Sequence, residues 1–297
     1  MLPALARLGR PKFLVGGLLG GALGTAIAAF ELGAVDWPAF ALAQLTVSSF
    51  HLMTHYANDY FDQAADALAV RTPFSGGSGV LASGALAPRV ALHAAQACAA
   101  LGIVGTLALT HGHAVAATAA AAMGLLAWWY SAPPVRLLAR SLGEIDAALV
   151  VAVLVPVCAY AAQTGRVDAL VLASTLPGAG AMLAMMLAVE YPDVEADIAS
   201  GKRNLVVRAG RARAAWLVGW AVAASFAGVG VAVAAGAPVT VAAFALLGVP
   251  AVVGLTGSLR RRAWESPGGV AGIAARGVAL FVTVSLGMLC GYAVALP

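Results

Sequence analysis

Three aspartates lie close together just after a long apolar stretch, in the segment NDYFDQAAD that begins at Asn58. Asp59, Asp62 and Asp66 are spaced by three and then four residues, so on a helix their carboxylates would share one face. Like charges this close repel each other, and only 10% of the residues in this chain are charged. We therefore expect a cation to compensate them. The alternative is a loop whose acids lie in water.

A second acidic segment, EYPDVEAD, carries Asp193 and Asp197 four residues apart, again on one helix face. Lys202, Arg203 and Arg208 follow shortly after it. Mg²⁺ usually binds through one or two carboxylates together with substrate phosphates. Lysine and arginine can take the remaining phosphate oxygens, arginine in a bidentate manner. The two segments together therefore predict a site for Mg²⁺ and a diphosphate.

The rest of the chain is apolar enough to lie in a membrane. Its 297 residues are 62% hydrophobic, and their 10% charged content is far below the ~25% typical of soluble domains. The apolar runs are continuous and rich in Ala and Leu, which indicates helices rather than the alternating strands of a membrane barrel. We predict an all-α polytopic membrane protein, with one domain over residues 1–297.

Nine apolar stretches have about the 20 residues needed to cross a bilayer. They are residues 13–30, 38–57, 90–110, 114–130, 145–162, 168–189, 214–235, 238–257 and 270–296. If the N-terminus is cytoplasmic, only Arg166 of the 17 Lys and Arg falls in an outside segment, and Arg276 lies within the last stretch. This follows the positive-inside rule. We therefore place the N-terminus and both acidic segments on the cytoplasmic side and the C-terminus on the opposite side.

Glycines and histidines add two expectations. Gly16, Gly20 and Gly24 recur at four-residue spacing in the first stretch, which is typical of close helix packing. His51 and His55 precede Asp59 by two turns and one turn, so we expect them on the same helix face, turned toward the interior of the bundle. A hydrogen-bonded histidine inside the bundle is the alternative.

A polar, glycine-rich segment, TPFSGGSG, follows Arg71 and ends at Gly79. Its position beside Arg71, directly after the first acidic segment, suits a lid over a cavity or a cradle for phosphate. A plain connector with turn residues is an equal alternative.

These motifs resemble those of a known family. NDYFDQAAD is similar to the NDxxDxxxD signature of the UbiA superfamily of intramembrane aromatic prenyltransferases, and DVEAD followed by GKRNLVVRAG resembles its second aspartate motif. YSAPP, from Tyr130, and SLGE, from Ser141, resemble further landmarks of the family. These two segments and the GKRNLVVRAG tail look most like the branch that prenylates 1,4-dihydroxy-2-naphthoate in menaquinone synthesis.

The resemblance implies Mg²⁺-dependent transfer of a polyprenyl group from an allylic diphosphate to an aromatic acceptor. It implies that the catalytic, metal-binding residues are Asp59, Asp62, Asp66, Asp193 and Asp197. With the residue patterns above, it implies that substrates contact Asn58, His55, Arg71, Tyr130, Arg136, Lys202, Arg203 and Arg208. The expected partners are the prenyl diphosphate, the acceptor and the lipid bilayer. The net charge of +4 comes mainly from Lys and Arg in loops, which the positive-inside rule explains. We therefore expect no nucleic-acid partner.

Other substrates and another class of protein stay open at this point. The acceptor could be 4-hydroxybenzoate, homogentisate or a lipid alcohol. A transporter with acidic intramembrane sites is a further alternative, although transporters often place broken helices near the midplane, whereas these acids lie at the ends of apolar stretches. A CDP-alcohol phosphotransferase fits less well, because its motif needs glycine where Gln63 follows Asp62.

Overall fold

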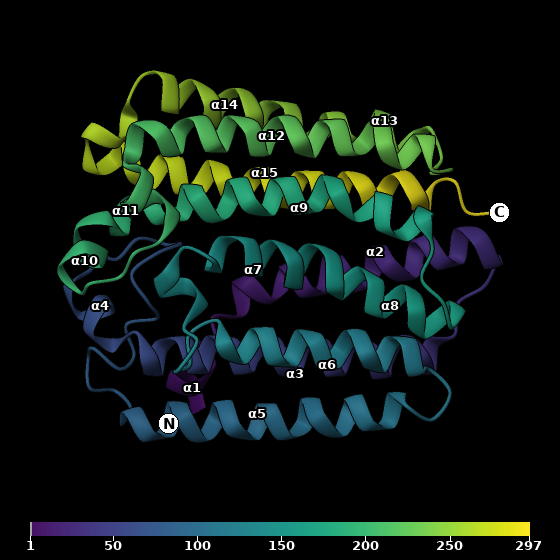
Figure 1. The fold of residues 1–297 in the computed structure, drawn as a ribbon, viewed down its shortest axis with the longest axis horizontal. Coiled ribbons are helices and arrows are strands. Elements are labelled where there is room, and N and C mark those ends of the chain that lie inside the picture. Colours follow the sequence, from purple (N-terminus) through teal and green to yellow (C-terminus); the bar gives the residue numbers. More distant parts are fainter. Residues whose placement is uncertain (1) are drawn as a thin grey trace.

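Long helices run side by side along the molecule in a computed structural model that describes residues 2–297 (Figure 1). Seven are single helices: α2 (Leu14–Leu32), α3 (Trp37–Phe61), α5 (Pro88–Leu109), α6 (Ala114–Trp129), α9 (Ala169–Glu190), α12 (Arg211–Ala234) and α15 (Pro267–Ala293). Between Leu2 and Pro297 there is no β-strand.

Two further rods are composite. The first joins α7 (Gly143–Leu149), a π-helical turn (Val150–Leu154) and α8 (Val155–Thr164). The second joins α13 (Thr240–Ala245), a short 3₁₀ turn (Leu246–Gly248) and α14 (Val249–Arg260). There are also four short α-helices: α1 (Leu2–Leu8), α4 (Gln63–Leu68), α10 (Val194–Ala199) and α11 (Leu205–Ala209). Short 3₁₀ turns cover Pro11–Phe13, Leu137–Arg140, Tyr191–Asp193 and Ala263–Glu265.

The helices agree with the predicted membrane protein. Within residues 2–297, seven helical stretches are long and apolar enough to cross a bilayer. Helices α3 and α6 occupy the other two predicted positions, but α6 has only 16 residues and α3 carries polar residues in its second half. The all-α membrane fold is thus confirmed, whereas the count of nine spans stays a prediction.

Helix α2 packs tightly through its glycines, as predicted. A side chain at Gly20 would meet Val155, and one at Gly24 would meet the backbone carbonyl of Pro156 in α8. Small residues at such positions let two backbones approach closely. The glycine stripe therefore fixes α2 against α8 rather than taking part in chemistry.

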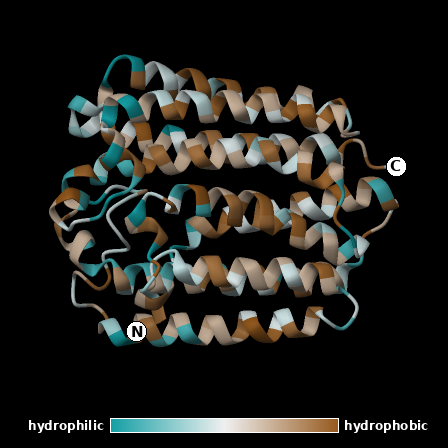
Figure 2. Ribbon diagram, in the orientation of Figure 1, coloured by the Kyte–Doolittle hydropathy of each residue, from teal (hydrophilic) through white to brown (hydrophobic). Residues whose placement is uncertain are grey.

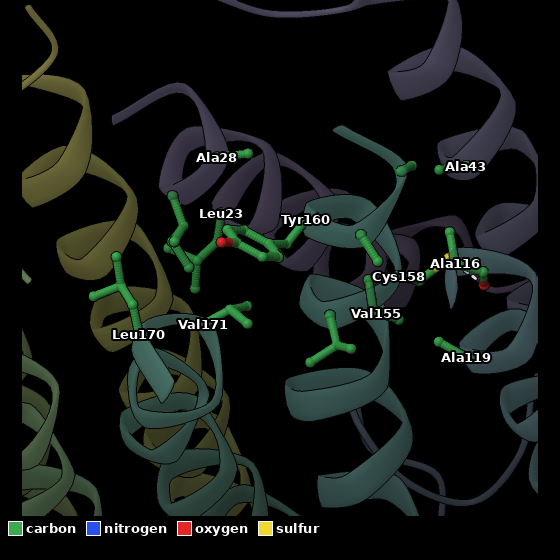
Figure 3. Close-up of a cluster of buried hydrophobic side chains, with 14 of the residues drawn as sticks. Leu23, Ala28, Ala43, Ala116, Ala119, Val155, Cys158, Tyr160, Leu170 and Val171 are labelled. Carbon is green, nitrogen blue, oxygen red and sulfur yellow. Dashed lines mark hydrogen bonds between the residues drawn. The ribbon is translucent and has the colours of Figure 1, made fainter. Parts of the chain in front are cut away.

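Buried side chains join the helices at the end away from the acidic segments. Figure 3 shows Tyr160 of α8 among Leu23 of α2 and Leu170 and Val171 of α9. The Tyr160 hydroxyl donates a hydrogen bond to an Asp168 carboxylate oxygen at a distance of 2.5 Å. This contact ties α8 to the start of α9.

Hydrophilic residues gather at the two ends of the bundle, and apolar residues fill its middle (Figure 2). Helices α4, α10 and α11 all lie at one end, beside the ends of α3 and α9 (Figure 1). The C-terminus lies at the other end (Figure 1). The two acidic segments, far apart in sequence, therefore meet at one end of the molecule.

Candidate active site

A cavity of about 240 Å³ extends from this end into the bundle. Its inner wall is apolar and includes Met123, Met182, Met185 and Phe281, which come from α6, α9 and α15. Its outer part is lined by charged side chains of both acidic segments. One cavity thus combines an apolar interior with a charged entrance.

The first acidic segment contains a break in the helix. Helix α3 ends at Phe61, and Asp62 is not helical, although its N–H still donates to the Asn58 carbonyl at 2.9 Å. The Asn58 side-chain amide donates to Asp62 Oδ2 at 2.8 Å and to Ser131 Oγ at 3.0 Å. Helix α4 then begins at Gln63. The expected continuous helix through all three aspartates is therefore wrong, because they span the junction of α3 and α4.

The three aspartates next to this break do not all face the cavity. Asp62 and Asp66 line the cavity, whereas Asp59 lies outside it and is only 3% exposed. Arg10, just before α2, makes an ion pair with Asp59, and its Nη2 lies 3.9 Å from Asp66 Oδ2. The Ser78 hydroxyl also donates to Asp59. Sequence reasoning missed Arg10 as a site residue, because its position before the first span explains it equally well as a topology signal.

Lys202 connects the two acidic segments. Its Nζ lies 2.9 Å from Asp62 Oδ2 and 3.7 Å from Asp197 Oδ1. The Asn204 amide donates to Asp197 Oδ2 at 2.7 Å. Burial by itself would lower the pKa of Lys202, but the two carboxylates outweigh this effect and raise the pKa above its usual value. The ammonium group therefore stays charged between the two motifs.

The glycine-rich segment, residues 72–79, contacts both acidic motifs. The Gly76 N–H donates to Asp193 Oδ2 at 3.2 Å, and Phe74 lines the cavity. Gly77 has a φ of 69°, and a side chain there would run into the Asp66 carboxylate. The segment therefore lies where a lid or a phosphate cradle would lie, and its role stays a prediction.

The carboxylates suit a metal ion that takes few protein ligands. Among residues 2–297, no group of three or more His, Cys, Asp and Glu is arranged to hold a metal by itself. Asp193 Oδ1 is buried without a hydrogen-bond partner, and Asp62, Asp66 and Asp197 face the same cavity. Mg²⁺ typically binds one or two carboxylates and completes its shell with water and substrate phosphates. The donor set therefore fits Mg²⁺ held jointly with a diphosphate.

Asp66 titrates in an unusual range. Burial raises its pKa to about 7, and the charges of Asp59 and Asp62 act in the same direction, while Arg10 opposes them. Near neutral pH, a proton therefore competes with any cation for this carboxylate.

Four arginines that were expected to contact substrate lie elsewhere. Arg71, Arg136, Arg203 and Arg208 are exposed and do not line the cavity. The backbone of Arg203 is held by its N–H donating to the Ala139 carbonyl at 3.2 Å, and its side chain points to the surface. The structure thus brings Lys202, but not the neighbouring arginines, to the two motifs. A basic run in the sequence does not show which of its members turns inward.

His51 and His55 line the cavity. The rings of His51 and His55 stack with centroids 4.9 Å apart. The Phe13 ring centroid lies 5.9 Å from that of His55 and 6.4 Å from that of Phe74. Lys12 Nζ lies 5.2 Å from the centroid of each phenylalanine ring. Their position agrees with the expectation that they face the interior, and their contact with substrate stays a prediction.

Tyr130 also lines the cavity and lies in an acidic environment. Burial raises its pKa well above the usual value, and the nearby carboxylates of Glu190, Glu144 and Asp146 add to this effect. Glu144 Oε1 accepts a hydrogen bond from the Leu205 N–H, which holds α11 against α7. No spacing or motif in the sequence assigns a role to Glu144 or Glu190, and Asp146 looks like an ordinary polar residue inside an apolar stretch.

Comparisons with known proteins agree with this architecture. No curated protein sequence matches the chain. It resembles the structure of a UbiA homologue from Archaeoglobus fulgidus bound to GPP and Mg²⁺, with a TM-score of 0.70 and 17% identity over 99% of each chain. It also resembles the apo structure of a UbiA homologue from Aeropyrum pernix K1, with a TM-score of 0.72 and 15% identity over 96% of this chain and 98% of that one.

A structure of digeranylgeranylglyceryl phosphate synthase is similar too, with a TM-score of 0.64 and 15% identity over 98% of both chains. At these identities the three structures show a shared fold. The family itself is shown by sequence, because residues 18–269 match the UbiA prenyltransferase family. The chain therefore belongs to the UbiA prenyltransferase family and is an integral membrane enzyme.

Proposed function

We propose that this enzyme transfers a polyprenyl group from an allylic diphosphate to an aromatic acceptor and requires Mg²⁺. One observation carries the proposal: Lys202 bridges Asp62 and Asp197, so two motifs far apart in sequence face one cavity with an apolar interior. The similar structure from Archaeoglobus fulgidus, bound to GPP and Mg²⁺, supports the same substrate class.

The geometry explains how the cavity would activate the diphosphate. Breaking the allylic C–O bond leaves negative charge on the departing diphosphate. Arg10 and Lys202 line the mouth of the cavity, so they can stabilise that charge as it develops. When bound by Asp62 and Asp66 on one side and Asp193 and Asp197 on the other, Mg²⁺ would neutralise the same oxygens.

The apolar interior would protect the other half of the substrate. An allylic cation reacts readily with water, and apolar walls exclude water from the reacting atoms. Met182, Met185 and Phe281 form such a wall next to the acidic mouth. We therefore propose that the prenyl chain lies within the bundle and the diphosphate at the end that carries the motifs.

We propose 1,4-dihydroxy-2-naphthoate as the acceptor, which makes menaquinone synthesis the pathway. Support comes from the resemblance of YSAPP, SLGE and GKRNLVVRAG to that branch. Two of these segments meet in the structure, because Glu144 of SLGE accepts a hydrogen bond from Leu205 of GKRNLVVRAG. Prenylation of 4-hydroxybenzoate, homogentisate or a lipid alcohol instead would change the branch and keep the reaction type.

We further propose that residues 1–297 act as one unit, with the N-terminus and both motifs cytoplasmic and the C-terminus on the opposite side. The bundle supports this, because one cavity collects residues from α2, α3, α6, α7, α9 and α15. Arg166 lies between α8 and α9, away from the end that carries the motifs and the other loop cations (Figure 1).

The test is an assay on the purified enzyme with Mg²⁺, labelled geranylgeranyl diphosphate and a panel of the four acceptors, with product identified by mass. We expect a prenylated product that disappears with EDTA and in Asp62→Ala and Asp193→Ala. Glu195→Ala is a matched control in the second motif, because Glu195 is exposed and pairs with Arg211. Normal turnover of Asp62→Ala, or product formation without Mg²⁺, would refute the proposal. A transporter would consume no prenyl diphosphate.

A further inference from the structure

Glu190 is the last residue of α9, and its carboxylate lines the cavity beside the second motif. The residue is only 6% exposed, and neither carboxylate oxygen has a hydrogen-bond partner in the protein. Glu144 lies close to it, and the two carboxyl groups can share one proton in a hydrogen bond to each other. That contact would satisfy one Glu190 oxygen, so Glu190 still presents an unused acceptor oxygen to the cavity.

Asp146 repeats this arrangement from the neighbouring helix. It lies in α7, is also 6% exposed, lines the same cavity, and leaves its Oδ1 without a hydrogen-bond partner. Glu190 and Asp146 both lie near Tyr130. Two buried carboxyl groups from different helices thus line the same cavity as Tyr130.

A buried acceptor without a donor is costly, so these carboxylates indicate a missing donor. An unpaired buried polar group costs about 1–3 kcal/mol, and a charged one costs more. The diphosphate cannot be the partner, because its oxygens are anionic acceptors that carboxylates repel. The cations Arg10 and Lys202, by contrast, are already paired with Asp59, Asp62 and Asp197.

We propose that Glu190 and Asp146 bind the hydroxyl groups of the acceptor ring and that Glu190 takes a hydroxyl proton as the ring is prenylated. This inference rests on the proposed function and names the part of the cavity that recognises the acceptor. It also defines the acceptor chemically as a ring bearing at least one hydroxyl donor. Any carboxylate on that ring would point away from this acidic pair.

The step balances as follows. The allylic C–O bond breaks with its electron pair on the diphosphate, and a ring carbon forms the new C–C bond. The hydroxyl proton passes to Glu190 while the O–H electrons enter the ring. The alkylated ring carbon then loses its hydrogen as a proton to water, which restores the aromatic ring, and Glu190 returns its proton to the ring oxygen.

The test compares Glu190→Gln and Asp146→Asn with the control Glu195→Gln, in the purified full chain. Each is assayed with 1,4-dihydroxy-2-naphthoate and with its two monomethyl ethers, or with the prenylated member of the panel and its O-methyl ether. For Glu190→Gln we expect acceptor turnover to fall by about 10² or more, the usual effect of losing a general base. For Asp146→Asn we expect a higher KM for the acceptor.

Three readouts separate this role from a structural one. In both variants the KM values for prenyl diphosphate and for Mg²⁺ stay within twofold of wild type, because the motif aspartates, Arg10 and Lys202 hold the diphosphate and its metal. Methylating the relevant hydroxyl lowers turnover in wild type but has little further effect in Glu190→Gln, because both changes remove the same contact. Glu195→Gln behaves as wild type.

Wild-type acceptor kinetics in Glu190→Gln would overturn the inference and leave the proposed function intact. If Glu190→Gln does not fold, the wild-type enzyme alone still tests the inference. Equal turnover of the hydroxyl acceptor and its methyl ether overturns the inference, whereas turnover that is lost only with the methyl ether supports it. A change confined to the KM for Mg²⁺ would also overturn it, since Glu190 would then be a metal ligand. Failure of the proposed function looks different: wild type would consume no prenyl diphosphate with any acceptor.

Discussion

At the scale of single residues, Lys202 shows how one cation can organise two acidic motifs. It lies between Asp62 and Asp197, whereas its neighbour Arg203 is exposed. The sequence indicates a basic run after the second motif, but it cannot choose between adjacent members. That choice depends on the turn before α11, where the Lys202 N–H donates to the Asp197 carbonyl at 2.8 Å.

Removing Lys202 should therefore affect both stability and binding. Lys202→Met leaves two buried carboxylates without their cation, and breaking a buried pair typically costs about 3–5 kcal/mol. We expect a lower melting temperature and a KM for prenyl diphosphate at least tenfold higher. Arg203→Met is the matched control and should change neither quantity. Equal effects of the two substitutions would show that Lys202 has no special position.

The titration of Asp66 leads to a pH prediction. Its pKa of about 7 means that the carboxyl group is increasingly protonated below pH 7. A bound cation must displace that proton, so the affinity for Mg²⁺ should fall by up to about tenfold per pH unit below 7 and level off above it. Titrating the enzyme with Mg²⁺ from pH 5.5 to 8.5 measures this. In Asp66→Asn the slope below pH 7 should flatten, and an unchanged slope would assign the proton to another group.

At the scale of elements, the sequence predicts the apolar helices well but misses the break at Asp62. Apolar length is a strong local signal, so each predicted stretch coincides with a helix or a composite rod. NDYFDQAAD contains neither Pro nor Gly, and its spacing suits a continuous helix. At the break, Asp62 accepts a local hydrogen bond from Asn58 and a tertiary one from Lys202, and no local pattern in the sequence records the Lys202 contact.

The glycine-rich segment gives a prediction with an internal control. Gly77→Ala should displace the segment, because Gly77 has a positive φ and a side chain there would meet the Asp66 carboxylate. We expect turnover to fall at least tenfold. Gly84→Ala carries the same backbone strain, of about 1–2 kcal/mol, but meets no atom within 4 Å. It should lower stability only, and similar kinetics in both variants would mean that the segment is a plain connector.

At the scale of the whole molecule, the bundle brings the ends of α3 and α9 together around one chamber. Composition and the two motifs predict an all-α membrane protein with a shared acidic site, and both features appear in the structure. The contributions of Arg10 and Asp146 could not be predicted. Arg10 reaches Asp59 across 49 residues, and no local pattern records such a contact.

The packing of α2 against α8 should support the whole bundle. In Gly24→Ala the new methyl group would meet the Pro156 carbonyl, and forcing extra atoms into a packed interface costs about 1–3 kcal/mol. We expect a lower melting temperature in detergent. Gly230→Ala in α12 meets no atom within 4 Å and should leave the melting temperature unchanged or raise it slightly. Identical melting of both variants would contradict the packing described for the glycine stripe.

The most direct test of the central claim measures binding rather than turnover. An unreactive thio analogue of geranyl diphosphate is titrated calorimetrically into wild type, Asp62→Asn, Asp193→Asn and the double variant, with and without Mg²⁺. If both motifs hold one Mg²⁺–diphosphate unit, wild-type binding needs Mg²⁺, each single variant loses most of the affinity, and the double variant loses little more. Mg²⁺-independent binding, or losses in the two single variants that add fully in the double variant, would contradict a shared site.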